Sequence, residues 1–391
     1  MPRPLALLAC PTGPAVLDAV LPALAAALDG SGPARVLVPA GPYGAAVEAM
    51  ASIGEPVESD DVALVVPTSG STGQPKGALL SAGALTASAT ASLEWLDGPG
   101  AWLLALPVTH IAGLQVLIRS LLTDTVPEVL DLSGGFTAEA FVAATERLAS
   151  AARRYTALVP TQLVRLLDSG GDALAALSTY DAVLVGGAAT PEDLVRAARD
   201  AGVRVVTTYG MTETCGGCVY DGVPLNGVEV LVDVDGRVLV AGPVLFSGYR
   251  GRPDLTAAVL GEDGWLVTGD LGRFDESGRF VWLARADDVV VSGGEKVSPG
   301  AVEAVLTEVP GVREVAVLGE PDRVWGESVV AVVVPADPDA PPTLEALHAV
   351  GALTLPGYAL PRRLVLVDAL PLLASGKRDH VALQELAAPT S

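Results

Sequence analysis

The sequence predicts an α/β protein with a large N-terminal domain and a small C-terminal domain. In the first 225 residues, short apolar segments alternate with stretches of helical periodicity, a pattern typical of mostly parallel sheets with helices on their faces. After residue 225, the Asp235-Gly236 dipeptide between two apolar strands indicates a hairpin in a β-rich subdomain. From about residue 288 the patterns of a small α+β unit follow. We therefore place the boundary at 285–288, which gives domains 1–286 and 287–391.

Each expected element is defined by its apolar periodicity and by the glycine, proline or aspartate residues that bound it. In the first part of the chain we expect strands at 62–66, 101–106, 155–159, 181–185 and 203–207, and helices at 81–95, 111–123, 137–152, 161–168 and 191–201. In the rest we expect strands at 227–234, 237–241, 264–271, 279–283, 313–319, 328–335 and 363–368, and helices at 299–308 and 343–353.

Composition excludes several classes of function. The 391 residues carry a net charge of −22, so no basic field exists to neutralise nucleic-acid phosphates. No apolar run reaches the roughly 20 residues that a membrane span needs, and the apolar stretch at the start is shorter than the h-region of about 7–15 residues in a signal peptide. Three cysteines do not make a disulfide framework, and Cys215 and Cys218 alone are a weak metal signal. We expect a cytoplasmic protein without a membrane span or a nucleic-acid partner.

Lysine is rare in this chain and confined to three short Gly- and Ser-containing stretches, at Lys76, Lys296 and Lys377. A compact ammonium on a flexible stem can reach a phosphate in a way that a planar guanidinium does not. The segment around Lys76 follows an expected strand and precedes an expected helix, and its glycines, hydroxyls and N–H groups can surround phosphate oxygens. Its spacing differs from that of the P-loop, and a tight turn is the alternative. The candidate phosphate ligands are Thr68, Ser69, Gly70, Ser71, Thr72, Gly73 and Lys76.

Five motifs in order resemble the signature of the adenylate-forming enzymes, the family of acyl- and aryl-CoA synthetases, nonribosomal-peptide adenylation domains and luciferases. The first is the segment 68–77. The others are the runs Thr208-Tyr-Gly-Met-Thr-Glu-Thr214, Trp265-Leu-Val-Thr-Gly-Asp270, 285–296 and Pro371-Leu-Leu-Ala-Ser-Gly-Lys377. Any one match could be accidental, whereas five in order at plausible spacing are highly specific.

The resemblance implies a site for ATP, Mg²⁺ and a carboxylic acid. When a carboxylate attacks the α-phosphorus, charge builds on the nonbridging oxygens and on pyrophosphate, so the site needs a cation, a metal and backbone donors. By resemblance, Lys377 bridges the carboxylate and the α-phosphate, Thr212 bonds the α-phosphate and Glu213 holds Mg²⁺. The implied nucleotide contacts are Gly187, Ala188, Thr208, Tyr209 and Gly210 near adenine, and Asp270 and Arg285 at the ribose. Gly186 and Gly210 are implied to line the acyl pocket.

The resemblance also implies a mobile C-terminal domain that rotates between two half-reactions. One pose brings the lysine to the adenylate, and the other opens a tunnel for the thiol of CoA, the implied co-substrate. Asp287 matches the hinge position. Gly293 and Gly294 are implied to pass close to pantetheine, because glycine lets a backbone come near a ligand. The role of Lys296 stays open between a solvated cation and a group that faces CoA.

The segment 107–121 narrows the substrate. It resembles the His-Ile-x-Gly-Leu-x-x-Leu-x-Arg-Ser pattern of the o-succinylbenzoate–CoA ligases of menaquinone biosynthesis, in a short, actinobacterial-like form. His110 and Arg119 are therefore candidates for the acyl pocket, and His110 also for the catalytic set. The alternatives are a gate or packing role for His110 and an external helix cation for Arg119. The phosphate segment begins early in this chain, so we expect a reduced N-terminal subdomain.

Other functions remain open at this point. They are another aryl- or acyl-CoA ligase, a stand-alone adenylation enzyme that loads a carrier protein, and a non-catalytic homologue that only binds nucleotide. The expected partners are the acid, ATP and CoA, and a homodimer is a candidate assembly.

Overall fold

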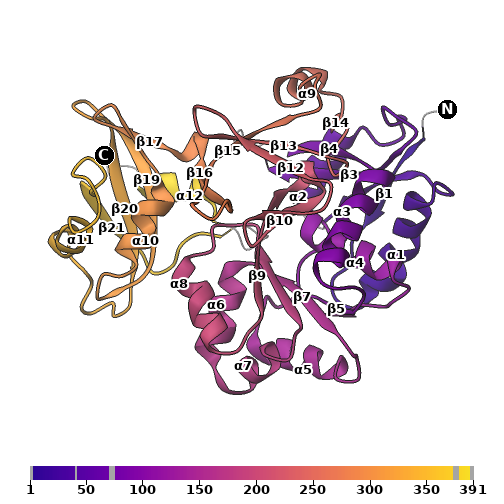
Figure 1. The fold of residues 1–391 in the computed structure, drawn as a ribbon, viewed down its shortest axis with the longest axis horizontal. Helices are drawn as coiled ribbons and strands as arrows, with labels where there is room; N and C mark the ends of the chain where they lie inside the picture. Colours follow the sequence, from indigo (N-terminus) through magenta and orange to yellow (C-terminus); the bar gives the residue numbers. More distant parts are fainter. Residues whose placement is uncertain (1–2, 40–41, 70–74, 373–377, 388–391) are drawn as a thin grey trace. The chain divides into compact units, whose positions relative to one another are not determined.

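The computed structural model describes residues 3–39, 42–69, 75–372 and 378–387, without the side chains of residues 42, 43, 69 and 380. The chain divides into two compact units, the first formed by 1–231 with 239–268 and the second by 232–238 with 269–391. Figure 1 shows the ribbon and labels many of the elements. In the described ranges, no helix has both the length and the apolar character needed to cross a bilayer.

The first sheet of the first unit has five strands in the order β1-β2-β3-β4-β14. They are β1 (Leu5–Ala9), β2 (Ala34–Val38), β3 (Val62–Ser69), β4 (Pro75–Ser81) and β14 (Gly248–Tyr249). The β1–β2 and β2–β3 pairs are parallel, whereas β4 is antiparallel to both β3 and β14. The final strand therefore comes from a part of the chain far from the other four.

The second sheet of the first unit has seven strands in the order β11-β10-β9-β8-β7-β5-β6. They are β5 (Ala101–Leu104), β6 (Glu128–Val129), β7 (Arg154–Leu158), β8 (Ala182–Gly186), β9 (Val205–Met211), β10 (Gly216–Tyr220) and β11 (Val223–Pro224). Strands β5 to β9 pair in parallel, and β10 and β11 add antiparallel strands at one edge. The carboxyl ends of β5, β7, β8 and β9 consequently lie along one edge.

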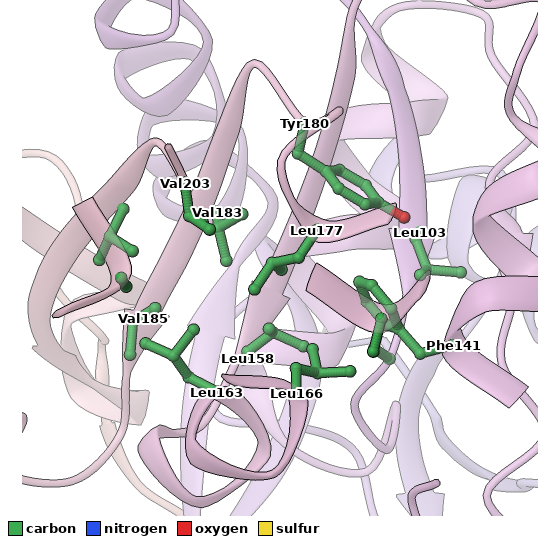
Figure 2. Close-up of a cluster of buried hydrophobic side chains, with 14 of the residues drawn as sticks. Leu103, Phe141, Leu158, Leu163, Leu166, Leu177, Tyr180, Val183, Val185 and Val203 are labelled. Atoms are coloured by element: carbon green, nitrogen blue, oxygen red, sulfur yellow. The ribbon is translucent and has the colours of Figure 1, made fainter. Parts of the chain in front are cut away.

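Helices cover the sheets of the first unit because their apolar faces require burial. They are α1 (Ala15–Leu28), α2 (Pro42–Ala51), α3 (Ala82–Trp95), α4 (Ile111–Leu122), α5 (Ala138–Arg147), α6 (Pro160–Ser169), α7 (Gly171–Leu177), α8 (Glu192–Asp200) and α9 (Pro253–Val259), with the 3₁₀ helix η1 (Thr212–Thr214). Figure 2 shows the buried cluster in which Phe141 of α5, Leu166 of α6 and Leu177 of α7 pack against strand residues such as Leu158 and Val183.

The second unit is built on a sheet in the order β18-β17-β20-β19, with β21 paired to β20. Alternate side chains of β20 belong to two separate buried clusters. Val329, Ala331 and Val333 belong to one buried cluster, and Val330 and Val332 to another, because successive side chains of a strand point to opposite faces. Helices α10 and α11 contribute to the first cluster and α12 to the second.

The elements of the second unit have the following bounds: β15 (Leu266–Phe274), β16 (Phe280–Arg285), η2 (Ala286–Asp288), β17 (Val290–Ser292), β18 (Glu295–Val297), α10 (Pro299–Leu306), β19 (Val312–Asp322), β20 (Gly326–Pro335), α11 (Leu344–Gly351), β21 (Arg363–Leu366) and α12 (His380–Ala387). The strands β12 (Glu229–Val232) and β13 (Arg237–Ala241) each contain residues of both units.

The predicted α/β class is confirmed, and so is the helix predicted at 81–95, which is α3. The sequence did not predict the strand before it: β4 begins within the phosphate segment and pairs antiparallel with β3, with Thr68 opposite Lys76. The residues Ala78, Leu79 and Leu80 are buried in this strand. Helix α3 begins only after Ser81, whose side chain accepts a hydrogen bond from the Ala84 N–H.

Candidate active site

The carboxyl ends of β8 and β9 bring two of the predicted segments together. Gly186, the last residue of β8, lies opposite Thr208 of β9. A Cβ at Gly186 would lie 2.1 Å from the Thr208 Oγ1, so only glycine fits there. Gly187 follows with a φ of +79° and is exposed together with Ala188. In parallel sheets, ligands bind at the carboxyl ends of the strands, and this edge therefore suits a ligand that contacts residues 186–188 and 208–213.

His110 reaches the same edge from β5. It lies a few residues beyond the end of this strand and is the residue before α4, whose Leu114 N–H bonds to the His110 carbonyl. Gly113 allows the tight entry into the helix, because a Cβ there would lie 2.3 Å from the Pro107 carbonyl oxygen. The topology thus places His110 beside the edge that carries the predicted nucleotide residues.

The predicted metal residue, Glu213, is held on the short helix η1. Thr214 is buried and braces this turn, because its hydroxyl donates to the Gly216 carbonyl at 2.7 Å and accepts from the Met211 N–H at 2.9 Å. The next residue, Cys215, has a left-handed φ of +52°. The Glu213 carbonyl also accepts a hydrogen bond from the Phe246 N–H at 2.8 Å.

Lys76 and Glu213 are linked through Tyr249, which sequence reasoning missed. The Tyr249 hydroxyl donates to Glu213 Oε1 at 2.7 Å. The Lys76 Nζ lies 5.5 Å from the centroid of the same ring, within cation–π distance. The structure therefore brings the lysine of the phosphate segment and the candidate metal carboxylate to one aromatic side chain.

The donor set fits Mg²⁺ only if a substrate completes it. Among the described residues, no group of three or more His, Cys, Asp or Glu side chains could hold a metal ion. One half-buried carboxylate is present at Glu213. Mg²⁺ is commonly held by one or two carboxylates together with substrate phosphates, so Glu213 suits a metal that arrives with a nucleotide.

A buried polar seam between α3 and α4 supports the turn that follows Glu213. The Cys215 carbonyl accepts hydrogen bonds from Gln115 Nε2 at 2.7 Å and from the Ser88 hydroxyl at 2.9 Å. Gln115 also donates to the Leu85 carbonyl. Burial raises the pKa of the Cys215 thiol, and the charge of Glu213 adds to the rise. Sequence reasoning missed the seam, whose only signal was the presence of polar residues at helical spacing.

Arg119 lies at the far end of the same seam. The residue is 3 % exposed. Its guanidinium donates to the Ser92 hydroxyl at 3.0 Å and to the Tyr220 hydroxyl at 3.3 Å, and lies 4.9 Å from the Trp102 ring centroid. Burial lowers its pKa. It stands nine positions after His110, roughly 14 Å along the helix axis. The structure therefore does not bring these two candidates together.

The second unit carries the predicted ribose and hinge residues. Asp270 and Arg285 are register partners on β15 and β16, and their Oδ1 and Nη1 atoms lie 3.6 Å apart. Gly269 leaves room for this pair, because a Cβ there would lie 2.7 Å from Arg285 Nη2. Arg285 Nη2 also lies 3.7 Å from Oδ2 of Asp287, the predicted hinge residue, within η2.

The two glycines of the predicted thiol tunnel form a hairpin turn. Gly293 and Gly294 connect β17 to β18 and have φ values of +63° and +85°, as two-residue turns of this hairpin type require. The Gly293 N–H donates to the Trp325 carbonyl at 2.8 Å. The turn accounts for both glycines, and their proximity to pantetheine stays a prediction.

Several predicted residues lie outside the described ranges. They are Gly70, Ser71, Thr72, Gly73 and Lys377. Thr68 and Ser69 end β3 before the first gap, and Pro75 and Lys76 begin β4 after it.

The sequence matches a known family over most of its length. The chain belongs to the AMP-binding enzymes: the AMP-binding enzyme family matches residues 25–250, and the AMP-binding enzyme C-terminal domain matches residues 301–377.

Individual relatives narrow the comparison. The chain is 49% identical over 368 residues to a probable 2-succinylbenzoate–CoA ligase of Mycobacterium tuberculosis, covering 93% of this chain and 94% of the relative. The structure of this chain is similar to that of o-succinylbenzoate CoA synthetase (MenE) from Bacillus subtilis in complex with the acyl-adenylate intermediate OSB-AMP. The TM-score is 0.77 at 26% identity, and the match covers 98% of this chain and 88% of the Bacillus chain. The Bacillus protein is also known in complex with ATP and a magnesium ion. The structure of the amide bond synthetase McbA from Marinactinospora thermotolerans is also similar to that of this chain. The TM-score is 0.81 at 28% identity, and the match covers 98% of this chain and 90% of McbA.

Proposed function

We propose that this protein is an AMP-forming acid–CoA ligase that converts 2-succinylbenzoate into its CoA thioester, a reaction of menaquinone biosynthesis. The observation that carries the proposal is the 49% identity, over nearly the whole of both chains, to a probable 2-succinylbenzoate–CoA ligase. The match to a structure that contains OSB-AMP supports the same acid.

In the first half-reaction, a carboxylate oxygen of the acid attacks the α-phosphorus of ATP, the acyl–oxygen–phosphorus linkage forms, and pyrophosphate leaves. Lys377 would balance the charge between carboxylate and α-phosphate, and Thr212 would donate to the α-phosphate. Lys76 and the segment 68–73 would bind the phosphates that leave. Such fixed charges stabilise the transition state because they need no reorganisation as its charge develops.

Nucleotide recognition would be divided among several segments. Residues 186–188 and 208–210 would surround the adenine, and Asp270 and Arg285 would contact the ribose. An ionised carboxylate only accepts hydrogen bonds, which suits the two ribose hydroxyls. Mg²⁺ held by Glu213 and the phosphates would neutralise phosphate charge.

In the second half-reaction, the CoA thiolate attacks the acyl carbon, the thioester forms and AMP leaves. Gly293 and Gly294 would lie along the pantetheine, and rotation about Asp287 would exchange the two half-reactions. His110 and Gly186 would line the acyl pocket. Arg119, the other candidate for this pocket, is buried against Ser92, Tyr220 and Trp102 and would not contact the acid.

The alternative is a different acid or a different acceptor on the same scaffold. The similarity to an amide bond synthetase favours an amine as the acceptor to test beside CoA, since an acyl-adenylate reacts with either nucleophile.

The test is product formation by the purified protein with ATP, Mg²⁺ and CoA across 2-succinylbenzoate, benzoate, cinnamates and short to medium fatty acids. We expect a preference of at least about a hundredfold in kcat/KM for 2-succinylbenzoate, roughly 2.7 kcal/mol of discrimination. A stronger preference for another acid would keep the chemistry and reject the substrate. Amide formation from added amines in place of thioester formation would reject CoA as the acceptor.

Lys377→Ala separates an enzyme from a protein that only binds nucleotide. We expect adenylate formation to fall at least about a hundredfold, because the cation acts mainly on the transition state, while ATP affinity changes less than about threefold. Wild-type protein that binds ATP without forming an adenylate from any acid of the panel would contradict the catalytic proposal.

A further inference from the structure

Tyr249 is fixed in place before any ligand binds. Its backbone pairs with Ala78 of β4, and its N–H donates to the Thr256 hydroxyl at 2.9 Å. The ring packs edge-on against Phe246, with the centroids 4.9 Å apart and an interplanar angle of 69°. Only 8 % of the residue is exposed. The position of its hydroxyl is therefore set by the sheet and by packing.

The segment 246–249 bonds to Glu213 at both its backbone and its side chain. The Phe246 N–H bonds to the Glu213 carbonyl at 2.8 Å, and the Tyr249 hydroxyl bonds to Glu213 Oε1 at 2.7 Å. A hydrogen bond from a hydroxyl to an ionised carboxylate is short and about twice as strong as a neutral one. Backbone and side chain of Glu213 thus take their orientation from the same neighbouring segment.

We propose that Tyr249 is a positioning residue that orients the Glu213 carboxylate for the metal of MgATP. The proposal rests on the proposed function, which assigns Glu213 to Mg²⁺. Mg²⁺ requires near-ideal octahedral geometry, so a carboxylate that rotates freely binds it less well. The Tyr249 bond holds the carboxylate through Oε1, and Oε2 would then be the oxygen that binds the metal.

Lys76 gives the same ring a second contact. Its Nζ lies 5.5 Å from the ring centroid, so the tyrosine stands between the lysine of the phosphate segment and the candidate metal carboxylate. Tyr249→Phe removes the hydroxyl and keeps the ring, and it therefore isolates the bond to Glu213 from the contact with Lys76.

The experiment measures ATP binding by calorimetry with Mg²⁺ and in EDTA, and then the Mg²⁺ dependence of adenylate formation. We expect Tyr249→Phe to weaken MgATP binding and to raise the half-maximal Mg²⁺ concentration by about tenfold, the lower end of the effect of removing an outer hydrogen bond to a metal ligand. Metal-free ATP binding should change less than about twofold. The control is Tyr180→Phe, which removes a buried hydroxyl that is bonded to Thr145 in the core cluster of α5, α6 and α7, and it should leave both quantities unchanged.

Glu213→Gln distinguishes a failure of the role proposed for Tyr249 from a failure of the metal assignment of Glu213. If Glu213→Gln raises the Mg²⁺ requirement and Tyr249→Phe does not, the role of Tyr249 is refuted while the function stands. If neither variant changes the requirement in a correctly folded protein, the metal assignment of Glu213 fails and the inference fails with it. The double variant should be no worse than Glu213→Gln, because Tyr249 acts through that carboxylate. The calorimetric readout needs no acid, so it is independent of which acid is the substrate.

Discussion

At the scale of single residues, the burial of Arg119 argues against a role of its charge in binding the substrate. Its described partners are two hydroxyls and an indole ring, and among the described residues no carboxylate pairs with it. Burying a cation is expensive, and the lowered pKa of Arg119 has the same cause. Helical spacing placed this residue on α4 but could not show that it faces the interior.

We expect Arg119→Met to leave the KM for the acid within about threefold and the melting temperature no lower than that of the wild type. The thioether fills much of the same volume, and replacing a buried charge by an apolar group is often neutral or stabilising. Arg119→Ala, which leaves a cavity, should lower stability by about 2–5 kcal/mol. A rise of more than about tenfold in the KM of Arg119→Met, with ATP binding unchanged, would instead support Arg119 as a ligand of the acid.

The sequence was informative where function requires a residue type at a fixed spacing. Lys76, Thr212 and Glu213 stand in recognisable motifs. Tyr249 stands in none, and Gln115 falls on an unspecified position of the 107–121 pattern. Their contacts cross 36 and 100 positions of the chain. A side chain whose role is to hold another one can be found only after the fold has brought the two together.

At the scale of elements, strand β4 determines which groups the phosphate segment can offer to a phosphate. A segment that enters a helix directly would offer the N-terminal N–H groups and the dipole of that helix to phosphate. Here Pro75–Ser81 forms a strand, so α3 begins well after Lys76. The apolar run 78–80, just before the helix predicted at 81–95, was too short to be predicted as a strand by periodicity alone.

The pair of helices α3 and α4 acts on the η1 turn through one carbonyl. We expect Gln115→Met and Ser88→Ala each to destabilise the protein by about 0.5–1.5 kcal/mol, since the Cys215 carbonyl keeps its other donor. The double variant leaves this buried carbonyl unpaired and should cost more than the sum of the two by at least about 0.5 kcal/mol. Urea unfolding midpoints, with MgATP affinity measured in parallel, provide the test.

Thr156→Val is the matched control for the seam. Its hydroxyl also donates to a buried carbonyl, that of Leu103, but it does not touch η1. It should lower stability by a similar amount and leave MgATP affinity unchanged. Strict additivity of Ser88→Ala and Gln115→Met, with unchanged MgATP affinity, would show that the seam does not position the turn.

At the scale of the whole molecule, the chain separates into two compact units, each with part of the predicted set. Glu213 and Lys76 belong to the first, and Asp270, Arg285 and Asp287 to the second. The two-domain α/β class was predictable because apolar alternation along β20 and the near-continuous apolar strands of the first unit are local patterns. The hinge at Asp287 stays a prediction from resemblance.

We expect Asp287→Pro to slow thioester formation at least about tenfold while adenylate formation stays within about threefold. Proline fixes φ at its own position and restricts the residue before it, so a rotation about this point would be hindered. Asp287→Ala keeps the backbone free and is the control. Equal loss of both half-reactions, measured as pyrophosphate release and CoA thioester in single-turnover assays, would rule out a selective hinge at this position.

The position of β14 in the first sheet has a consequence for how the protein is made. Its partner β4 ends at Ser81, whereas β14 begins at Gly248. A ribosome that adds about 5–20 residues per second needs roughly ten to thirty seconds to synthesise the chain between them. Throughout that time one edge of β4 has no β14 to pair with, and such an edge can pair with a neighbouring nascent chain. The yield of folded protein should therefore depend on translation speed and on chaperones that shield this edge until residue 249 has left the ribosome.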